Sequence, residues 1–305
     1  FEPRPTFGPV DCRGAPVTTP ILQGMHDVVE RYDGFVLDLW GVVHDGVTVF
    51  PGVIDALKRL RDASKKLVFL SNAPRRAEIV AAQLDGFGIT AALHHGVMSS
   101  GEATWRHLHD RPDEWYRGLG PNCLRIGPAR DNQALKGLAF KEADSVENAD
   151  FVLVTGPQDL MSTAEPYDDM LAVARKRDLP MVCANPDLEV IRGGVRQICA
   201  GAIAARYEAQ GGDVRWHGKP DASVYEPCFE MLGITDKSRI LGIGDTLLTD
   251  IKGANAAGLD ALLVARGIHG DDLVGANGTV DGDRIAYSAA AAGVTVIGAM
   301  SEFVW

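Results

Sequence analysis

No apolar run in the 305-residue sequence comes close to the roughly 20 residues that a membrane-spanning helix needs. Residues 1–25 also lack the charged and then apolar pattern of a signal peptide, and we expect them to form an extended arm. The five cysteines form no CxxC pair, and their apolar neighbours in MVCAN and RQICAG indicate buried free thiols. These absences predict a cytoplasmic protein without a membrane segment, a disulfide or a structural zinc site.

Positive charge is scarce as well, because 41 Asp and Glu outnumber 30 Lys and Arg and give a formal net charge of -11. Nucleic acids and anionic membranes favour basic surfaces, so the composition predicts that neither is a partner. A small anionic substrate stays compatible with this charge. One bound metal ion and one lysine are enough to reverse the local field inside a site.

Strands and helices alternate along most of the chain, without internal repeats. Short apolar runs such as FVLDL, KLVFLSN and RILGIGD are followed by segments with helical spacing, and a last strand is expected in GVTVIG, residues 293–298. This alternation indicates right-handed βαβ units and a parallel sheet, which is an α/β fold. Ligands of such sheets bind beyond the carboxyl ends of the strands. Asp38, Ser71 and Asp245 stand at predicted strand ends, so we expect them to line one crevice.

The middle of the chain has strands of its own in CLRIG, FVLVTG and PMVCAN, with helical segments between them. We interpret this stretch as a second α/β unit inserted between two halves of the first. The predicted division is 1–101 for the first part of the core with the N-terminal arm, 102–213 for the insertion, and 214–305 for the second part of the core. An inserted unit above a strand-end crevice can act as a lid that excludes water.

Four short motifs follow one another along the chain: DLWGV, SNAP, GKPD and GDTLLTD. Each alone is compatible with an ordinary turn or helix cap. Together, at predicted strand ends, they suit phosphoryl transfer. Asp38 would be the nucleophile that forms an aspartyl phosphate. Asp38, Asp245, Asp250 and the main-chain carbonyl of Trp40 would bind Mg²⁺, which prefers oxygen ligands.

The remaining motif residues have roles at the phosphate. Ser71 and the amide of Asn72 would donate hydrogen bonds to a phosphoryl oxygen, and Lys219 would supply the charge that balances nucleophile and phosphate. In CANPDL of the insertion, Asn185 and Asp187 either contact the substrate or form an ordinary turn.

The four motifs in this order resemble the haloacid dehalogenase (HAD) superfamily. HHGVMSSGEATWRHL, CANPDL and RQICAGAIAARYEAQGG resemble the cap entry, the substrate-facing cap loop and the return helix of its class IIA. The resemblance spans residues 30–300, and a DLWGV first motif is similar to that of an uncharacterised class IIA subgroup. It implies a Rossmann-like HAD core with a C2-type cap domain, and a magnesium-dependent phosphatase for a small phosphorylated metabolite. Because many class IIA members pair through their caps, a homodimer is a further expectation.

The resemblance fails at Trp40. Most phosphatases of the superfamily carry an aspartate two residues after the nucleophile, where it protonates the leaving oxygen and then activates water. An indole N–H can do neither, and loss of a general acid–base group typically slows a reaction by about 10²–10⁴-fold. His44 and Asp45 lie just downstream and are candidates for a surrogate acid, although a solvated turn before Gly46 suits them better.

Three functions stay open for such a site. One is a working phosphatase that favours activated leaving groups, and another is a phosphate-binding regulatory protein with little turnover. The third is a dehalogenase, which needs no magnesium, so the retained Asp245 and Asp250 argue against it. A phosphonatase is disfavoured because nothing marks a Schiff-base lysine. Arg75 and Arg76 either pair with a substrate anion or are surface charges at a helix start.

Overall fold

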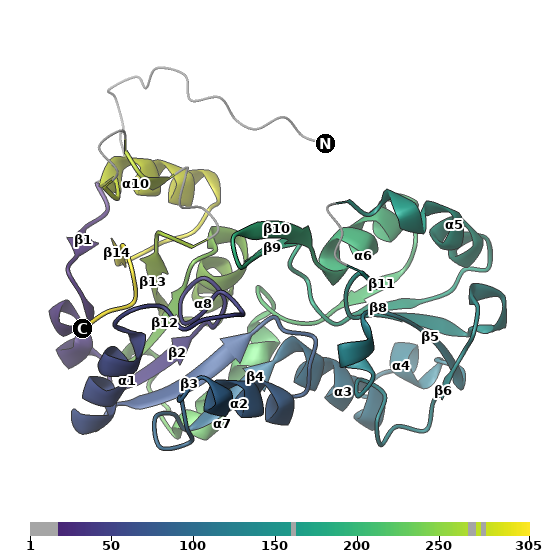
Figure 1. The fold of residues 1–305 in the computed structure, drawn as a ribbon, viewed down its shortest axis with the longest axis horizontal. Helices are drawn as coiled ribbons and strands as arrows, with labels where there is room; N and C mark the ends of the chain where they lie inside the picture. The colour runs from purple at the N-terminus through teal and green to yellow at the C-terminus, as the bar shows by residue number, and fades with distance from the viewer. Residues whose placement is uncertain (1–17, 160–162, 268–272, 276–278) are drawn as a thin grey trace.

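A computed structural model describes residues 18–159, 163–267, 273–275 and 279–305. The expected N-terminal arm lies mostly outside these ranges. Figure 1 shows two sheets side by side, each flanked by helices, and confirms the α/β class. Within the described part of the chain, no helix is both long enough and apolar enough to cross a membrane.

The larger sheet consists, among the described residues, of seven parallel strands in the order β1-β14-β13-β12-β2-β3-β4. Its central strands are short apolar runs that are buried along their whole length, as expected for a parallel sheet covered on both faces. The strands are β1 (Ile21–Leu22), β2 (Gly34–Leu37), β3 (Lys66–Ser71), β4 (Gly96–Ser99), β12 (Ile240–Gly244), β13 (Asp260–Val264) and β14 (Gly298–Met300).

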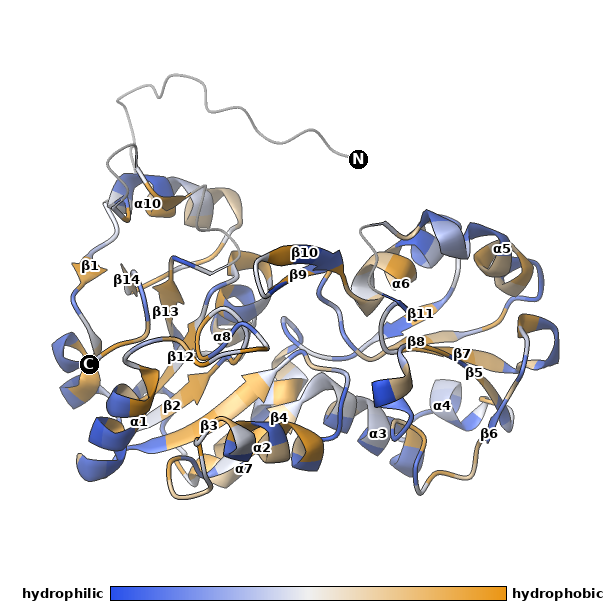
Figure 2. Cartoon of the chain, in the orientation of Figure 1, coloured by the Kyte–Doolittle hydropathy of each residue, from blue (hydrophilic) through white to orange (hydrophobic). Residues whose placement is uncertain are grey.

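Alternate side chains of the central strands serve two separate cores. Phe35 and Phe69 pack with α1 and α2, whereas Val36 and Val68 pack with α7, α8 and α10 on the other face. Figure 2 shows the strands and the inner helix faces as the most apolar parts. The helices on these two faces are α1 (Val53–Asp62), α2 (Ala77–Gly86), α7 (Glu226–Leu232), α8 (Lys252–Ala256) and α10 (Gly282–Ala291), and α3 (Ser100–Asp110) also lies beside this sheet.

The smaller sheet is also parallel, in the order β11-β8-β7-β5-β6. Its elements are β5 (Asn122–Ile126), β6 (Lys141–Glu142), β7 (Phe151–Val154), β8 (Met181–Cys183) and β11 (Val214–Trp216), with α4 (Glu114–Arg117), α5 (Asp168–Lys176) and α6 (Ala200–Ala209). Because β11 pairs with β8, residues 214–216 extend the sheet of the insertion, although the prediction assigned them to the core. The predicted domain boundaries otherwise stay a prediction.

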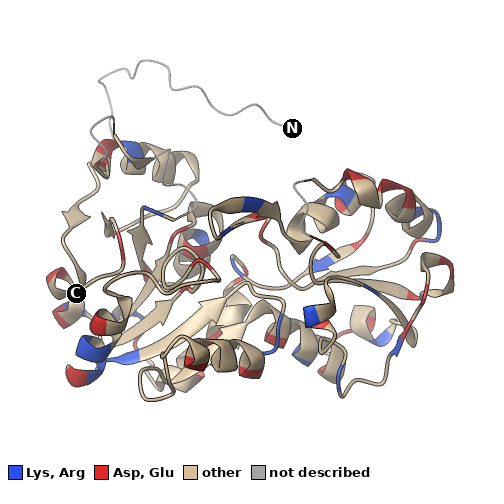
Figure 3. Cartoon of the chain, viewed as in Figure 1, with Lys and Arg blue, Asp and Glu red and all other residues tan. Residues whose placement is uncertain are grey.

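An antiparallel hairpin of β9 (Glu189–Arg192) and β10 (Val195–Ile198) follows the CANPDL loop. Figure 1 places it between the two sheets, on the side of α8 and α6. Figure 3 shows that charged residues lie mostly on helices and loops, which leaves the strand interiors to apolar packing.

Two elements differ from expectation. The last strand is β14, which begins at Gly298, so the prediction for residues 293–298 is wrong. The backbone of Thr295 is bound instead by a side chain, because Asn255 Oδ1 accepts from its N–H at 2.7 Å and Asn255 Nδ2 donates to its carbonyl. The helical segment expected after RILGIGD begins as a wider π-type turn, Leu247–Ile251, before α8. The thiols of the sequence prediction are confirmed as free and buried in Cys123, Cys183, Cys199 and Cys228.

Candidate active site

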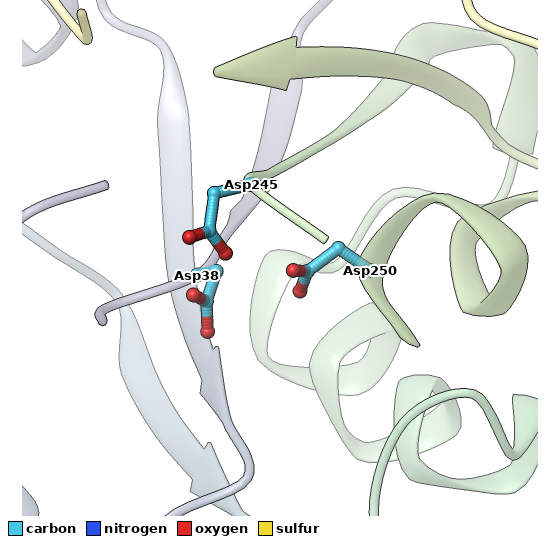
Figure 4. A group of neighbouring side chains, drawn as sticks. All are labelled: Asp38, Asp245 and Asp250. Carbon is cyan, nitrogen blue, oxygen red and sulfur yellow. The ribbon is translucent and has the colours of Figure 1, made fainter. Parts of the chain in front are cut away.

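Three carboxylates meet at the carboxyl edge of the larger sheet. Asp38 directly follows β2, Asp245 directly follows β12, and Asp250 lies in the π-type turn. One oxygen of each lies within 4.8 Å of the others, and each residue is only 6% exposed. Figure 4 shows the three side chains facing a shared space. Since β2 and β12 are parallel neighbours, their carboxyl ends lie side by side and bring distant sequence segments together.

The π-type turn aims Asp250 back toward β12. The Asp250 amide donates to the Thr246 carbonyl at 3.0 Å, and the Thr246 amide donates to Asp250 Oδ2 at 3.1 Å. The Thr246 hydroxyl also donates to Asp245 Oδ1 at 3.0 Å. A single wide turn, a type often found at functional sites, therefore fixes two of the three carboxylates.

Lys219 lies between two of these carboxylates. Its Nζ donates to Asp38 Oδ1 and to Asp250 Oδ1, both at 2.6 Å, and to the Leu70 carbonyl at 3.0 Å. Burial opposes the charge of Lys219, but Asp250 and Asp38 raise its pKa well above the usual value. Burial also raises the pKa of Asp38, and the neighbouring Asp250 and Asp245 add to this rise.

One ammonium group thus faces three buried carboxylates, which leaves negative charge in excess. A set of carboxylate oxygens is the donor type of hard divalent cations, so Asp38, Asp245 and Asp250 could hold one. The main chain that follows Trp40 reaches this cluster, because Gly41 lies against the Asp245 carboxylate. In that loop, Gly41 N–H donates to the His44 carbonyl and His44 N–H to the Leu39 carbonyl, and neither bond uses the carbonyl of Trp40.

Asn72 connects the two sheets at the site. Its Nδ2 donates to Asp187 Oδ1 at 2.7 Å and to the Lys219 carbonyl at 3.2 Å, while its Oδ1 accepts from the Lys219 amide at 2.8 Å. Ser71 is buried at the end of β3, where its Oγ accepts from the Ala73 amide at 3.2 Å. The structure therefore brings Ser71, Asn72 and Lys219 together as the sequence predicts.

The CANPDL loop lies over this site. Asn185 Oδ1 accepts from the Asp187 amide at 2.9 Å, so the loop is an Asx turn that presents Asp187 to Asn72. Burial raises the pKa of Asp187 to about 6, against the lowering effect of the Asn72 hydrogen bond. Asn185, Asp187, Asn72 and Trp40 all line a cavity of about 270 Å³.

Trp40 forms part of the cavity wall. Its ring packs edge to face with the His44 ring at a centroid distance of 5.2 Å. It also lies directly on Gly46, whose φ of 85° and close contact leave no space for a Cβ. The position of the missing aspartate is therefore filled by an apolar surface that is built into the loop.

His44 and Asp45 are not brought to the cavity, whose described lining contains neither. His44 is 2% exposed, its Nδ1 accepts from the Gly46 amide at 3.0 Å, and burial lowers its pKa to about 4. Asp45 accepts from the amides of Val47 and Thr48, and these hydrogen bonds lower its pKa. The geometry favours the turn interpretation for both residues over the surrogate acid.

Comparison with known proteins agrees with this geometry. A sequence model described as haloacid dehalogenase-like hydrolase matches residues 35–141, and one described as HAD-hydrolase-like matches residues 216–292. A crystal structure of a haloacid dehalogenase-like hydrolase from Brucella suis 1330 is 33% identical with a TM-score of 0.79, and the match covers 93% of this chain and 100% of that one. The chain belongs to the haloacid dehalogenase-like hydrolases.

Two curated relatives of this haloacid dehalogenase-like hydrolase carry named activities. D-glycerol 3-phosphate phosphatase of Mycobacterium tuberculosis is 30% identical over 80% of this chain and 66% of its own length. 5'-nucleotidase YutF of Bacillus subtilis is 26% identical over 79% of this chain and 90% of its own length.

Several cavity residues of this haloacid dehalogenase-like hydrolase were not predicted from its sequence. The insertion contributes three of them, Arg130, Asp131 and Arg192, which line the cavity together with Trp40 and Asn72. No local pattern marks them, because a surface arginine beside an aspartate is common in any loop. Arg75 was noted only as one of two open choices, and the structure assigns it to the cavity wall.

Proposed function

We propose that this hydrolase is a magnesium-dependent phosphatase that acts through an aspartyl phosphate on a small phosphorylated metabolite. The observation that carries the proposal is the contact of Lys219 with Asp38 beside Asp245 and Asp250 at the strand ends. This arrangement combines a nucleophile, a balancing cation and two further carboxylates, which is what in-line phosphoryl transfer requires.

Mg²⁺ would be held by Asp38, Asp245, Asp250 and the Trp40 carbonyl. When bound, it would neutralise charge on the phosphoryl group and orient that group toward the nucleophile. The fit rests on the donor chemistry, since all three side chains offer carboxylate oxygens and none is a sulfur or imidazole ligand.

The reaction would have two steps, and in each step one bond to phosphorus forms while another breaks. An oxygen of Asp38 attacks phosphorus, the bond from phosphorus to the ester oxygen breaks, and the alcohol leaves as its anion. Water then attacks the phosphorus of the aspartyl phosphate, which releases inorganic phosphate and restores the Asp38 carboxylate. The two protons of that water end on the released alcohol and phosphate. Lys219, Ser71 and Asn72 hold the phosphoryl oxygens throughout.

Trp40 sets the preference among substrates. Without a carboxylic acid at this position, the leaving oxygen departs without a proton from that side chain, so stable anions such as phenolates leave fastest. Asn185 and Asp187 would contact the part of the substrate that extends into the cavity. The relatives named for glycerol phosphate and nucleotides support a small phosphorylated metabolite as the substrate class.

The proposal is tested with 4-nitrophenyl phosphate in the presence of Mg²⁺. Wild type should release 4-nitrophenol, and Asp38→Asn should reduce kcat by at least about 10³-fold, because the amide cannot act as the nucleophile. Circular dichroism of Asp38→Asn controls for folding. Equal rates for the two proteins would show that Asp38 is not the nucleophile.

The same assay decides the alternative of a phosphate-binding regulatory protein. Its supporting observation is that Trp40 fills the acid–base position while His44 and Asp45 are engaged in a turn away from the cavity. Binding of inorganic phosphate with Mg²⁺ by a wild-type protein that turns over no activated ester would favour this alternative.

A further inference from the structure

Two neighbouring arginines after the Ser71 loop take different directions. Arg76 donates from Nε to Glu102 Oε2 at 2.6 Å, and its guanidinium carbon lies 3.9 Å from the centroid of the Trp105 ring. Arg75 lines the 270 Å³ cavity instead. Because Arg75 follows Asn72 by only three residues, its position is fixed relative to the phosphate end of the site.

The guanidinium of Arg75 makes no hydrogen bond or ion pair within the part of the chain that the structure describes. Burial lowers its pKa, Asp131 opposes this, and the charges of Arg130 and Arg192 lower it further. A partly buried cation without a paired anion is unfavourable. An anionic group that entered the cavity would remove this penalty.

Two guanidinium groups of the insertion face the same cavity. Arg130 lies in the short helical turn Ala129–Asp131, and Arg192 ends β9. Arg192 likewise has no ion pair among the residues in the described ranges, and Arg130 reaches only Asp131, at 4.0 Å. The core and the insertion therefore both contribute positive groups to one cavity.

Among the described residues, no acidic side chain of the cavity lining forms an ion pair with Arg75. Asp187 accepts from Asn72 at the phosphate end, and Asp159 is exposed. Asp131 is 3% exposed and forms no ion pair with Arg75, and its Oδ1 has no hydrogen-bond partner among the described residues. Burial raises the pKa of Asp131, against the lowering effect of the Arg130 and Arg75 charges.

We propose that the substrate carries a second anionic group, a carboxylate or a second phosphate, and that Arg75 binds it. This inference rests on the proposed phosphatase function and extends it to the substrate class. A guanidinium binds either group through two parallel hydrogen bonds. Arg130 and Arg192 add attraction from the insertion, so the substrate contacts both parts of the chain.

The experiment compares two probes of similar shape in the presence of Mg²⁺. In 4-carboxyphenyl phosphate the group opposite the phosphate is an anionic carboxylate, and in 4-carbamoylphenyl phosphate it is a neutral amide. Wild type should favour the carboxylate by about 10-fold or more in kcat/KM, the size of one charge-assisted hydrogen bond. Arg75→Met should bring this ratio close to one, because kcat/KM for the carboxylate probe falls more than kcat/KM for the carbamoyl probe. Arg75→Lys, which keeps the charge but loses the fork, should be intermediate.

Arg59→Met is the matched control, because Arg59 is exposed on α1, pairs with Asp55, lies over the Trp305 ring and is absent from the described cavity lining. It should keep the wild-type ratio. Phenylene 1,4-bisphosphate in the same assay distinguishes a phosphate preference from a carboxylate preference. Absence of a preference for either anion in wild type, or a preference that survives in Arg75→Met, would overturn the proposal.

Binding of the corresponding phosphonates separates this inference from the phosphatase function. If wild type hydrolyses neither probe, the phosphatase proposal fails. The ratio of the Kd values for 4-carboxyphenyl and 4-carbamoylphenyl phosphonate, measured by calorimetry on wild type and Arg75→Met, still decides whether Arg75 recognises the second anion.

Discussion

The main chain and the side chain of Trp40 have separate roles in the proposed site. Its carbonyl belongs to the peptide that leads into Gly41, which lies against the Asp245 carboxylate, while its ring covers Gly46 and forms a wall of the cavity. The first role depends only on the backbone and the second only on the side chain. Under the proposed function, the site would therefore keep a metal ligand and lose a proton donor through one residue.

Trp40→Asp should restore part of the missing proton transfer. We expect kcat/KM for an alkyl phosphate such as glycerol 3-phosphate to rise by about 10-fold or more, while the rate with 4-nitrophenyl phosphate changes less. The reason is that an alkoxide needs a proton more than a phenolate does. Steady-state kinetics on both substrates measure the effect.

The matched control is Trp40→Asn, which has the size of aspartate and removes the ring equally, but cannot donate a proton at neutral pH. Equal gains in the Asn and Asp variants would mean that the freed space causes the change, and the proton-transfer argument would be lost.

Gly41 is a backbone position where geometry and metal binding meet. Its φ is 79°, and a Cβ there would overlap the Asp245 carboxylate. We expect Gly41→Ala to displace Asp245 and weaken Mg²⁺ affinity by about 10-fold or more, with a strain cost on the order of 1 kcal/mol. Calorimetric titration with Mg²⁺ measures the affinity.

Gly88→Ala supplies the comparison for strain alone. Gly88 has a similar φ of 81°, but no atom lies within 4 Å of the position that a Cβ would take, so both variants carry the same backbone strain. Its Mg²⁺ affinity should equal that of wild type. Similar losses of affinity in both variants would attribute the effect to general destabilisation.

The strands that carry the site were predictable because each is an apolar run that ends in a polar residue. Asp38 and Asp245 close such runs, and parallel pairing then forces their side chains to one edge. The last strand was not predictable in the same way. GVTVIGAM is apolar almost throughout, and the choice of Gly298 as the start of the strand depends on Asn255, a residue from another element.

The positions of the two arginines after the Ser71 loop could not be predicted from the sequence either. Arg75 and Arg76 are adjacent and chemically identical, so spacing assigns neither of them to the cavity. The choice depends on Glu102 and Trp105 of α3, which bind Arg76 and leave Arg75 to turn inward. Long-range partners of this kind cannot be inferred from one sequence, whereas motif residues at strand ends can.

Asp187 in the CANPDL loop contributes to the pH dependence of the free energy of unfolding. Burial raises the pKa of Asp187 to about 6, from a usual value near 3.9 in an unfolded chain. Between these values the folded state holds a proton that the unfolded state has lost, so this residue makes the free energy of unfolding fall as pH rises from about 4 to about 6. The size is on the order of 3 kcal/mol.

Asp187→Asn should remove this dependence, because its amide oxygen still accepts from Asn72 but does not ionise. Relative to wild type, its free energy of unfolding should therefore increase between about pH 4 and pH 7. Urea unfolding at unit pH steps measures the difference. Parallel curves for the two proteins would mean that Asp187 ionises normally in the folded state.

The two sheets are connected directly around the site. Ser100 Oγ lies 3.0 Å from the Ala73 carbonyl and 2.6 Å from the Ala184 carbonyl, and Asn72 reaches Asp187. The carboxylate cluster lies beneath this junction with more negative than positive groups. The folded chain therefore concentrates anionic charge at the carboxyl edge of its larger sheet.

A divalent cation should accordingly stabilise the whole molecule. Mg²⁺ at about 100 times its Kd should add about 2.7 kcal/mol to the free energy of unfolding, if the unfolded chain does not bind it. Thermal unfolding followed by fluorescence should show a Tm that rises with the Mg²⁺ concentration. NaCl of equal ionic strength controls for general screening of the formal net charge of -11. Asp245→Asn should lose most of the Mg²⁺ effect and keep the NaCl effect. A rise of the same size in Asp245→Asn would show that Mg²⁺ acts elsewhere on this acidic chain.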